Sequence, residues 1–175
     1  MTGRPSNWWS GMPWFFIQLR YMKPFLTFGA GVLNQGFVLD GVDDHVDFGN
    51  LGVNNDSQSF SVSLWLKPDA LSLDGNTHII YGNGSQITGG IGSFNAHLYT
   101  TSEFGAKGLA FHIGNRQVWS ARVVTGPVFT AGKWHHITAT YDGSRTYGGL
   151  KIYIDGVAQS VNNGGTGFAG AGSPV

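Results

Sequence analysis

The sequence predicts an all-β fold in which two antiparallel sheets pack face to face. The first observation is the alternation of apolar and polar residues over 137–141 and 150–155, which places one face of each strand on a core. The second is the Asp-Gly step after each of these runs, because Asp-Gly between alternating strands favours a hairpin turn. The third is the composition, since 28 glycines and 14% aromatic beside 11% charged residues suit a turn-rich β protein. At 175 residues, one domain is expected, with room for an appendage.

Residues 1–35 form an aromatic-rich N-terminal segment. Arg20 and Lys23 interrupt its apolar run, so we do not expect a secretory signal peptide. Alternation over residues 15–22 predicts a strand. The segment therefore either adds a first strand to the sandwich or serves as an arm that docks on a partner. The second alternative follows from the number of aromatic side chains, which would make an exposed patch larger than monomers tolerate.

Residues 36–50 are expected to form two short strands around a turn at 41–44. Residues 60–66 alternate between apolar and polar and predict a longer strand. Pro68 ends that strand because proline has no N–H to donate. Trp65 falls on the face opposite the apolar residues, where it either packs beneath a loop or lines the concave sheet.

Four further strands are predicted in the middle of the chain, separated by loops that include a glycine-rich stretch. His97 and His112 fall on the polar faces of two of them. The predicted strands are residues 78–81, 94–99, 109–113 and 117–124.

The stretch 133–161 is read as three strands and two turns, with the third strand over residues 157–161. The following residues, 162–175, are rich in glycine and low in apolar side chains. Residues 165–170 match the dinucleotide-binding pattern Gly-x-Gly-x-x-Gly, but too few residues follow for the helix that this motif needs. We therefore interpret the match as a chance one.

The net charge, the cysteine count and the length of the apolar runs exclude several classes of function. The formal net charge is zero, so no electrostatic footprint for nucleic acid or for an anionic membrane is present. The absence of cysteine excludes disulfides and thiolate metal sites. No apolar run reaches the length that spans a membrane.

Three blocks of sequence, in this order, resemble the laminin-G-like, concanavalin A-like jelly-roll family. The blocks are FVLDGVDDHVDFG at residues 37–49, FSVSLWLKP at 60–68, and WHHI, YDG and LKIYIDG within 134–156. The resemblance covers residues 36–175 and implies a two-sheet jelly roll that binds glycan or protein. It also implies an extracellular, cell-surface or virion location. Members of the family usually continue with one more closing strand, and we expect domain 36–175 to lack it.

Catalysis is not expected. The family that the chain resembles includes laminarinase-type glucanases. These enzymes use two glutamates, because one protonates the leaving oxygen while the other attacks. This chain has a single glutamate, Glu103, in a predicted loop. Its aspartates fall at turn positions, which aspartate favours by capping its own backbone. No Gly-x-Ser-x-Gly motif is present, although a Ser-His-Asp set assembled from distant positions stays open.

Two places in the sequence carry residue types that bind metals. His135 and His136 are adjacent in a predicted strand, so they point to opposite faces and cannot share one ion. Calcium is the better candidate, because Asp40, Asp43 and Asp44 supply the hard oxygen ligands that it prefers. No cofactor is required by any motif, and calcium is the one metal that the sequence favours.

The leading hypothesis is a non-catalytic module that binds glycan or protein through aromatic and planar polar side chains. The residues proposed for this contact are Tyr99, Trp119, Trp65, His97 and Arg116. The second hypothesis is a structural component of a virion or cell-surface assembly, joined through the N-terminal arm or an open sheet edge. The third is a glycoside hydrolase or lyase.

Overall fold

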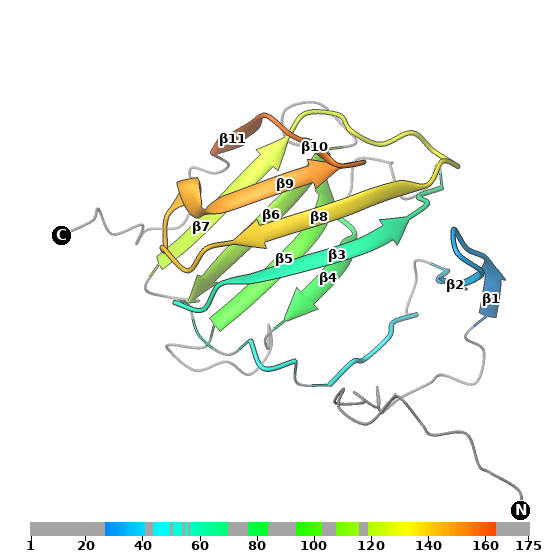
Figure 1. Ribbon diagram of the computed structural model, residues 1–175, viewed down its shortest axis with the longest axis horizontal. Helices are drawn as coiled ribbons and strands as arrows, with labels where there is room; N and C mark the ends of the chain where they lie inside the picture. The colour runs from blue at the N-terminus through cyan, green and yellow to red at the C-terminus, as the bar shows by residue number, and fades with distance from the viewer. Residues whose placement is uncertain are drawn as a thin grey trace, which may run out of the picture.

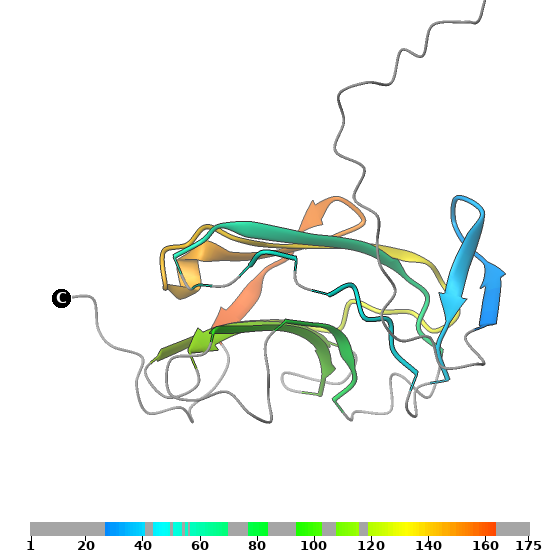
Figure 2. The ribbon, with the colours of Figure 1, turned by 90° about the horizontal axis from the view of Figure 1, so that it is seen from below.

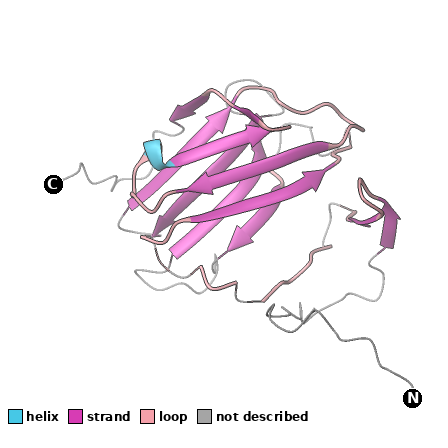
Figure 3. Ribbon diagram, in the orientation of Figure 1, coloured by secondary structure: helices cyan, strands magenta, loops and turns pink. Residues whose placement is uncertain are grey.

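The computed structural model describes residues 27–40, 44–49, 51–53, 55, 57–69, 77–83, 94–102, 108–115 and 119–163 (Figure 1). Within these ranges the regular structure is β-strand, apart from the short 3-10 helix η2 (Tyr147–Gly149) (Figure 3). No helix in the described ranges has the length and apolar character needed to cross a membrane.

Two antiparallel sheets lie face to face as separate layers (Figure 2). The four-stranded sheet has the order β10-β9-β8-β3 and the five-stranded sheet the order β11-β7-β6-β5-β4. The predicted all-β sandwich is therefore confirmed. The strands of the first sheet are β3 (Phe60–Leu66), β8 (His135–Tyr141), β9 (Leu150–Ile154) and β10 (Val157–Ala158). Those of the second are β4 (Ile79–Asn83), β5 (Phe94–Thr101), β6 (Gly108–Asn115), β7 (Trp119–Thr125) and β11 (Val161–Asn163).

The core lies between the two layers and consists of the apolar side chains that alternate along each strand. In β8 the burial pattern is strictly alternating, as the sequence predicts. Phe60 of β3 links the layers, because its ring meets Phe111 of β6 edge to face at 6.0 Å and Tyr141 of β8 at 5.9 Å. Edge-to-face contacts of this kind add to the burial of apolar area.

The Asp155-Gly156 step forms the predicted hairpin turn. Its residues have φ values of 52° and 80°, and positive φ at both positions is what a type I′ turn requires. The Asp142-Gly143 step behaves differently, because residues 142–149 form a longer loop that contains η2. There the Asp142 carboxylate accepts a hydrogen bond from the Ser144 N–H at 2.8 Å, so the aspartate caps the loop.

The expected third strand over residues 157–161 is wrong as a single element. β10 pairs with β9 over only two residues, and β11 pairs with β7 in the opposite layer. The chain therefore crosses between the layers near Ser160 and closes this side of the sandwich. Val161 packs against the core after the crossing.

The described part of the N-terminal segment forms a hairpin of β1 (Thr27–Ala30) and β2 (Gln35–Val38). These two strands pair with each other in a sheet of their own and belong to neither layer of the sandwich. The hairpin lies at one end of the molecule (Figure 1). The backbone of Gly36 lies near the Trp134 indole. The strand predicted over residues 15–22 lies outside the described residues.

The second strand expected within residues 36–50 does not form. Residues 44–49 belong to no strand, and Phe48 keeps 45% of its surface exposed. Its alternation with Val46 is genuine, but none of the described strands pairs with this stretch. Alternation without a partner strand gives no ladder of hydrogen bonds.

The two sides of the sandwich differ in how well they are covered. The inward side chains of β8 and β9 are almost fully buried, whereas those of β3 are only partly buried. On the same side of the other layer, Ile80 and Tyr81 of β4 pack against the core and are also only partly buried. The β3 and β4 edges are thus the less protected side of the core.

Candidate site on the outer face of the five-stranded sheet

The outer face of the five-stranded sheet carries polar side chains from three neighbouring strands. β5 places Asn95, His97 and Tyr99 on this face, because alternate side chains point to opposite faces and the intervening residues fill the core. The register puts His97 opposite His112 of β6, and His112 opposite Arg122 of β7. We call these five residues, Asn95, His97, Tyr99, His112 and Arg122, the outer polar row.

Four members of the outer polar row contact one another in two pairs across the strands. The rings of His97 and His112 stack with 6.0 Å between centroids and 19° between planes. The Arg122 guanidinium donates from Nη1 to the Tyr99 hydroxyl at 3.1 Å. This bond joins β7 to β5 over the intervening β6 and fixes both side chains on the sheet.

Burial controls the protonation of the two histidines. It is the largest cause that lowers the pKa of His112 to about 4, and the positive charges of His97 and Arg122 act in the same direction. Burial also lowers the pKa of His97. Both imidazoles are therefore neutral near neutral pH, and each presents one N–H donor and one ring nitrogen acceptor.

Asn95 stands out because its side-chain oxygen is buried and unsatisfied. The residue is 6% exposed, and its Oδ1 has no hydrogen-bond partner. Its direct neighbour on β6 is Gly114, which has no side chain to bond with it. A buried acceptor without a partner costs about 1–3 kcal/mol, so such a group in a native fold needs an explanation.

The structure brings together two of the five predicted ligand-binding residues. His97 and Tyr99 lie side by side in the outer polar row. Trp65 lies on the other layer, on the outer face of β3, where it is 45% exposed and its ring is 5.0 Å from that of His136. Trp119 begins β7, but its side chain is not described, and Arg116 lies outside the described residues.

Sequence reasoning did not select His112 and Arg122 for the site. Alternation places each of them on a polar face, but only the pairing of β5 with β6 and of β6 with β7 shows that the faces coincide. That pairing is long-range information. The one local signal is that His112 and Arg122 are the ionisable side chains of β6 and β7.

The calcium hypothesis rested on Asp40, Asp43 and Asp44. The Asp40 N–H donates to the Asp44 carboxylate at 3.1 Å, in an exposed loop, and Asp43 lies outside the described residues. Among the residues that the structure describes, no three His, Cys, Asp or Glu side chains gather in a way that could hold a metal ion.

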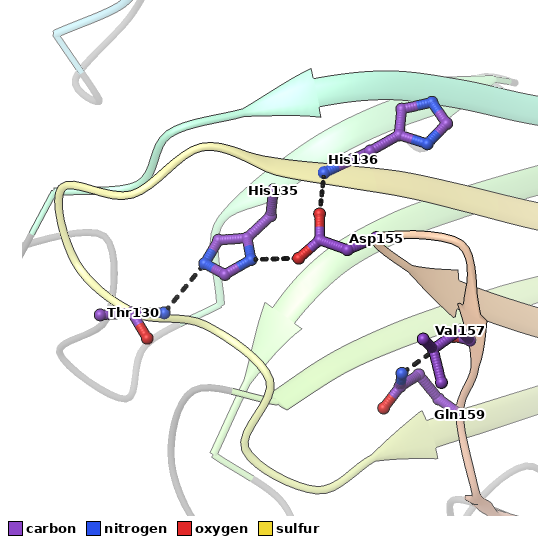
Figure 4. Close-up of polar contacts among 6 residues, drawn as sticks. All are labelled: Thr130, His135, His136, Asp155, Val157 and Gln159. Carbon is purple, nitrogen blue, oxygen red and sulfur yellow. Dashed lines mark hydrogen bonds and ion pairs between the residues drawn. The ribbon is translucent and has the colours of Figure 1, made fainter.

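The neighbouring histidines of β8 have separate roles, and their rings point apart (Figure 4). His135 Nδ1 lies 3.1 Å from the Asp155 carboxylate, while its Nε2 accepts from the Thr130 N–H at 3.2 Å. Because Nε2 accepts, the proton belongs on Nδ1, and both ring nitrogens are engaged. Asp155 also accepts from the His136 N–H at 2.7 Å, the largest cause of its lowered pKa. His135 thus fastens the start of β8 to the β9–β10 turn.

Comparison with known proteins identifies the family to which this fold belongs. The family model described as the concanavalin A-like lectin/glucanases superfamily matches residues 40–175, which is most of the chain. No curated protein and no solved structure gives a significant match.

Proposed function

Because the chain belongs to the concanavalin A-like lectin/glucanase superfamily, we propose that it is a non-catalytic module that binds a glycan through the outer polar row. One sandwich hosts many activities, so the proposal depends on the site rather than on the fold. An extracellular or surface location is part of the proposal, since laminin-G-like domains are commonly extracellular.

The single observation that carries the proposal is the unpartnered Oδ1 of Asn95. A glycan hydroxyl can donate the hydrogen bond that this acceptor lacks. The stacked rings of His97 and His112 lie on the same face of the sheet, on β5 and β6. A few directed polar groups around an apolar floor are the usual composition of a small-ligand site.

The non-catalytic part of the proposal is supported by the chemistry of this face. Hydrolysis of a glycosidic bond by the common mechanism needs two carboxyl groups flanking the bond. The strands β4 to β7 and β11 contain neither aspartate nor glutamate. Incubation of the purified chain with the glycan that it binds is therefore expected to release no new reducing ends.

Replacing Asn95 by alanine is expected to weaken glycan binding by at least about tenfold, because the ligand loses its acceptor in a buried setting. The same variant is expected to keep the stability of the free chain within about 1 kcal/mol, since the removed oxygen makes no bond there. A glycan array selects the oligosaccharide, calorimetric titration measures its affinity, and urea unfolding measures stability.

Trp65→Ala is the matched control for Asn95→Ala, because Trp65 lies on the outer face of the opposite layer. It is expected to leave the affinity unchanged. If Trp65→Ala loses binding while Asn95→Ala binds fully, the glycan site lies on the four-stranded sheet instead. Failure of the wild-type chain to bind any glycan on the array would contradict the proposed function itself.

A second candidate function, a component of a larger assembly, is favoured by the exposed apolar side chains of the β1–β2 hairpin. Leu33, in the turn, is 91% exposed. The rings of Phe28 and Phe37 contact each other at a tilt, with 5.3 Å between centroids, and remain 53% and 43% exposed. A cluster of exposed apolar residues of this kind marks an interaction surface more often than isolated ones do. We propose that a further copy or a partner covers this hairpin in such an assembly.

Leu33→Asp is expected to shift the chain from oligomer to monomer if the hairpin mediates assembly, because a carboxylate is costly to bury in an apolar contact. Light scattering on a sizing column gives the mass of each variant. Val157→Asp is the control, since Val157 is also a largely exposed apolar residue but lies on β10, away from the hairpin. A wild-type chain that is already monomeric at high concentration would argue against the assembly function.

A further inference from the structure

The outer edge of β3 is an unpaired strand edge, a feature that the proposed glycan site does not use. β3 is the last strand of the four-stranded sheet and pairs with β8 alone. The Asp155 N–H donates to the His136 carbonyl at 2.8 Å, so the main-chain groups of His136 point toward β9. Because these groups alternate in direction along an antiparallel strand, those of Ile137 point toward β3, where the register places Leu64 opposite.

The residues of β3 between those bonded to β8 therefore turn their N–H and C=O groups away from the sheet. These residues are Ser61, Ser63 and Trp65. Within the described ranges, none of their main-chain groups has a hydrogen-bond partner. A row of unpaired donors and acceptors along a strand is a template on which another strand can pair.

The inner face of β3 is also incompletely covered. Its apolar side chains are only partly buried, whereas the inner side chains of β8 and β9 are almost fully buried. Val53, in the segment before β3, packs against the core, but its carbonyl accepts from the Asn83 side chain of β4 at 2.8 Å. None of the described residues of that segment forms a ladder with β3. A strand that completes this edge needs an apolar inner face and a length close to the 7 residues of β3.

Residues 15–22 of the N-terminal segment have this pattern and this length. They lie outside the described residues, and none of the described strands uses them. Their alternation gathers Phe15, Ile17, Leu19 and Tyr21 on one face of the strand that the sequence predicts. That face supplies the apolar cover that the inner side of β3 lacks.

The β1–β2 hairpin shows where segment 15–22 rejoins the sandwich. The backbone of Gly36, in β2, lies near the Trp134 indole. Trp134 precedes His135, and His135 is opposite Leu66 in the register of β8 and β3. The hairpin is therefore near the Leu66 end of β3, the end toward which the β3 arrow points (Figure 1).

The link between segment 15–22 and β1 limits how the segment can reach β3 of its own chain. Residues 23–26 form this link, which spans at most about 18 Å when fully extended. Antiparallel pairing would place residue 22 at the far end of β3, about 20 Å along the strand. Pairing within one chain is thus favoured only in the parallel direction, whereas every strand pair in the described ranges is antiparallel. A second copy is free of this restriction.

We propose that segment 15–22 of one copy pairs antiparallel with the free edge of β3 in a second copy, as a fifth strand of its four-stranded sheet. The main chain of the added strand bonds to Ser61, Ser63 and Trp65. Its apolar face covers the partly buried inner side chains of β3. The contact is separate from the exposed β1–β2 hairpin and from the outer polar row.

The chain has no cysteine, so introduced thiols report on this contact directly. Ser63→Cys is mixed in turn with Gln18→Cys and with Arg20→Cys, the mixtures are oxidised, and mass spectrometry identifies the joined peptides. A disulfide between residue 63 of one chain and residue 18 or 20 of the other is expected, because these side chains face outward on neighbouring strands. Lys151→Cys is the matched control, since it lies on the outer face of the same sheet but on β9. It is expected to give no such link.

Light scattering on a sizing column tests the same contact without cysteines. The wild type is expected to be an oligomer whose mass rises with concentration. Leu19→Asp is expected to shift the mass to that of the monomer, because a carboxylate is costly to bury in an apolar contact. Gln18→Asp adds the same charge on the outward face and is expected to leave the mass unchanged. Leu33→Asp, on the hairpin, is expected to leave the disulfide between the mixed chains intact.

A wild-type chain that is monomeric at every concentration, with no disulfide between mixed chains, would overturn the proposal. A disulfide within one chain of the double variant Gln18→Cys/Ser63→Cys, with none between mixed chains, would assign the added strand to the same copy and refute exchange between copies. Equal linking of Lys151→Cys and Ser63→Cys would show that the contact is not directed to the β3 edge. None of these results bears on glycan binding, which is proposed for the other layer.

Discussion

Lowering the pH from about 7 to about 4 is expected to remove roughly 3 kcal/mol of unfolding free energy through His112. Its pKa in the folded chain is about 4, lowered by burial and then by the charges of His97 and Arg122, whereas an unfolded histidine titrates near 6.5. The unfolded chain therefore binds more protons between these two values. The contribution of His112 is fully present above about pH 6.5 and is lost as the pH falls toward 4.

The groups around His112 add to this dependence without changing its sign. The pKa of His97 is lowered by burial, so His97 loses stabilisation as the pH falls below about 6.5. Asp142 and Asp155 also have lowered pKa values, but a carboxyl of this kind loses its contribution only below its unfolded pKa of about 3.9. The window between pH 6.5 and 4 thus reports on the buried histidines.

Urea unfolding at a series of pH values measures the effect. His112→Gln is expected to flatten the slope of unfolding free energy against pH in this window, because glutamine does not titrate. His45→Gln is the matched control, since His45 is exposed in the segment before β3. Parallel pH profiles for the wild type and His112→Gln would show that His112 is hydrated in the folded state and would contradict the burial argument.

The sequence predicted a strand correctly where the segment of alternating apolar and polar residues pairs with another strand. Residues 60–66 and 137–141 alternate cleanly and pair with each other along their length as β3 and β8. Residues 46–48 alternate too, yet no strand forms there, because none of the described strands pairs with them. Alternation reports which face of a strand is apolar, and pairing depends on distant segments that the local pattern does not contain.

The candidate site shows the same limit of prediction from local alternation. Alternation correctly placed Tyr99, His97 and Trp65 away from the core, but it could not say that Trp65 belongs to the other layer. His112 and Arg122 join the site only through the register of β5, β6 and β7. The unsatisfied oxygen of Asn95 is likewise a property of the assembled sheet, because it depends on the glycine that the register sets opposite it.

Replacing Phe111 by alanine is expected to lower the unfolding free energy by about 3–5 kcal/mol, the cost of a large cavity in a packed core. Phe111 lies on the inner face of β6 and is fully buried, and its ring meets that of Phe60 from the opposite sheet. The cavity would therefore open between the two layers, where neither sheet can move inward without disturbing its own hydrogen bonds. Phe111→Leu keeps part of the volume and is expected to lose less.

Phe37→Ala is the control for the core variant, because it removes the same atoms from the exposed hairpin. Phe37 is 43% exposed and contacts Phe28 of its own hairpin, which pairs with neither layer of the sandwich. Its replacement is expected to cost less than about 1 kcal/mol, as is usual for surface positions. Equal losses for Phe37→Ala and Phe111→Ala in urea unfolding would mean that the hairpin is part of the cooperative core. The separation of the hairpin from the sandwich would then be wrong, and its apolar side chains would have to be reassigned from partner contact to folding.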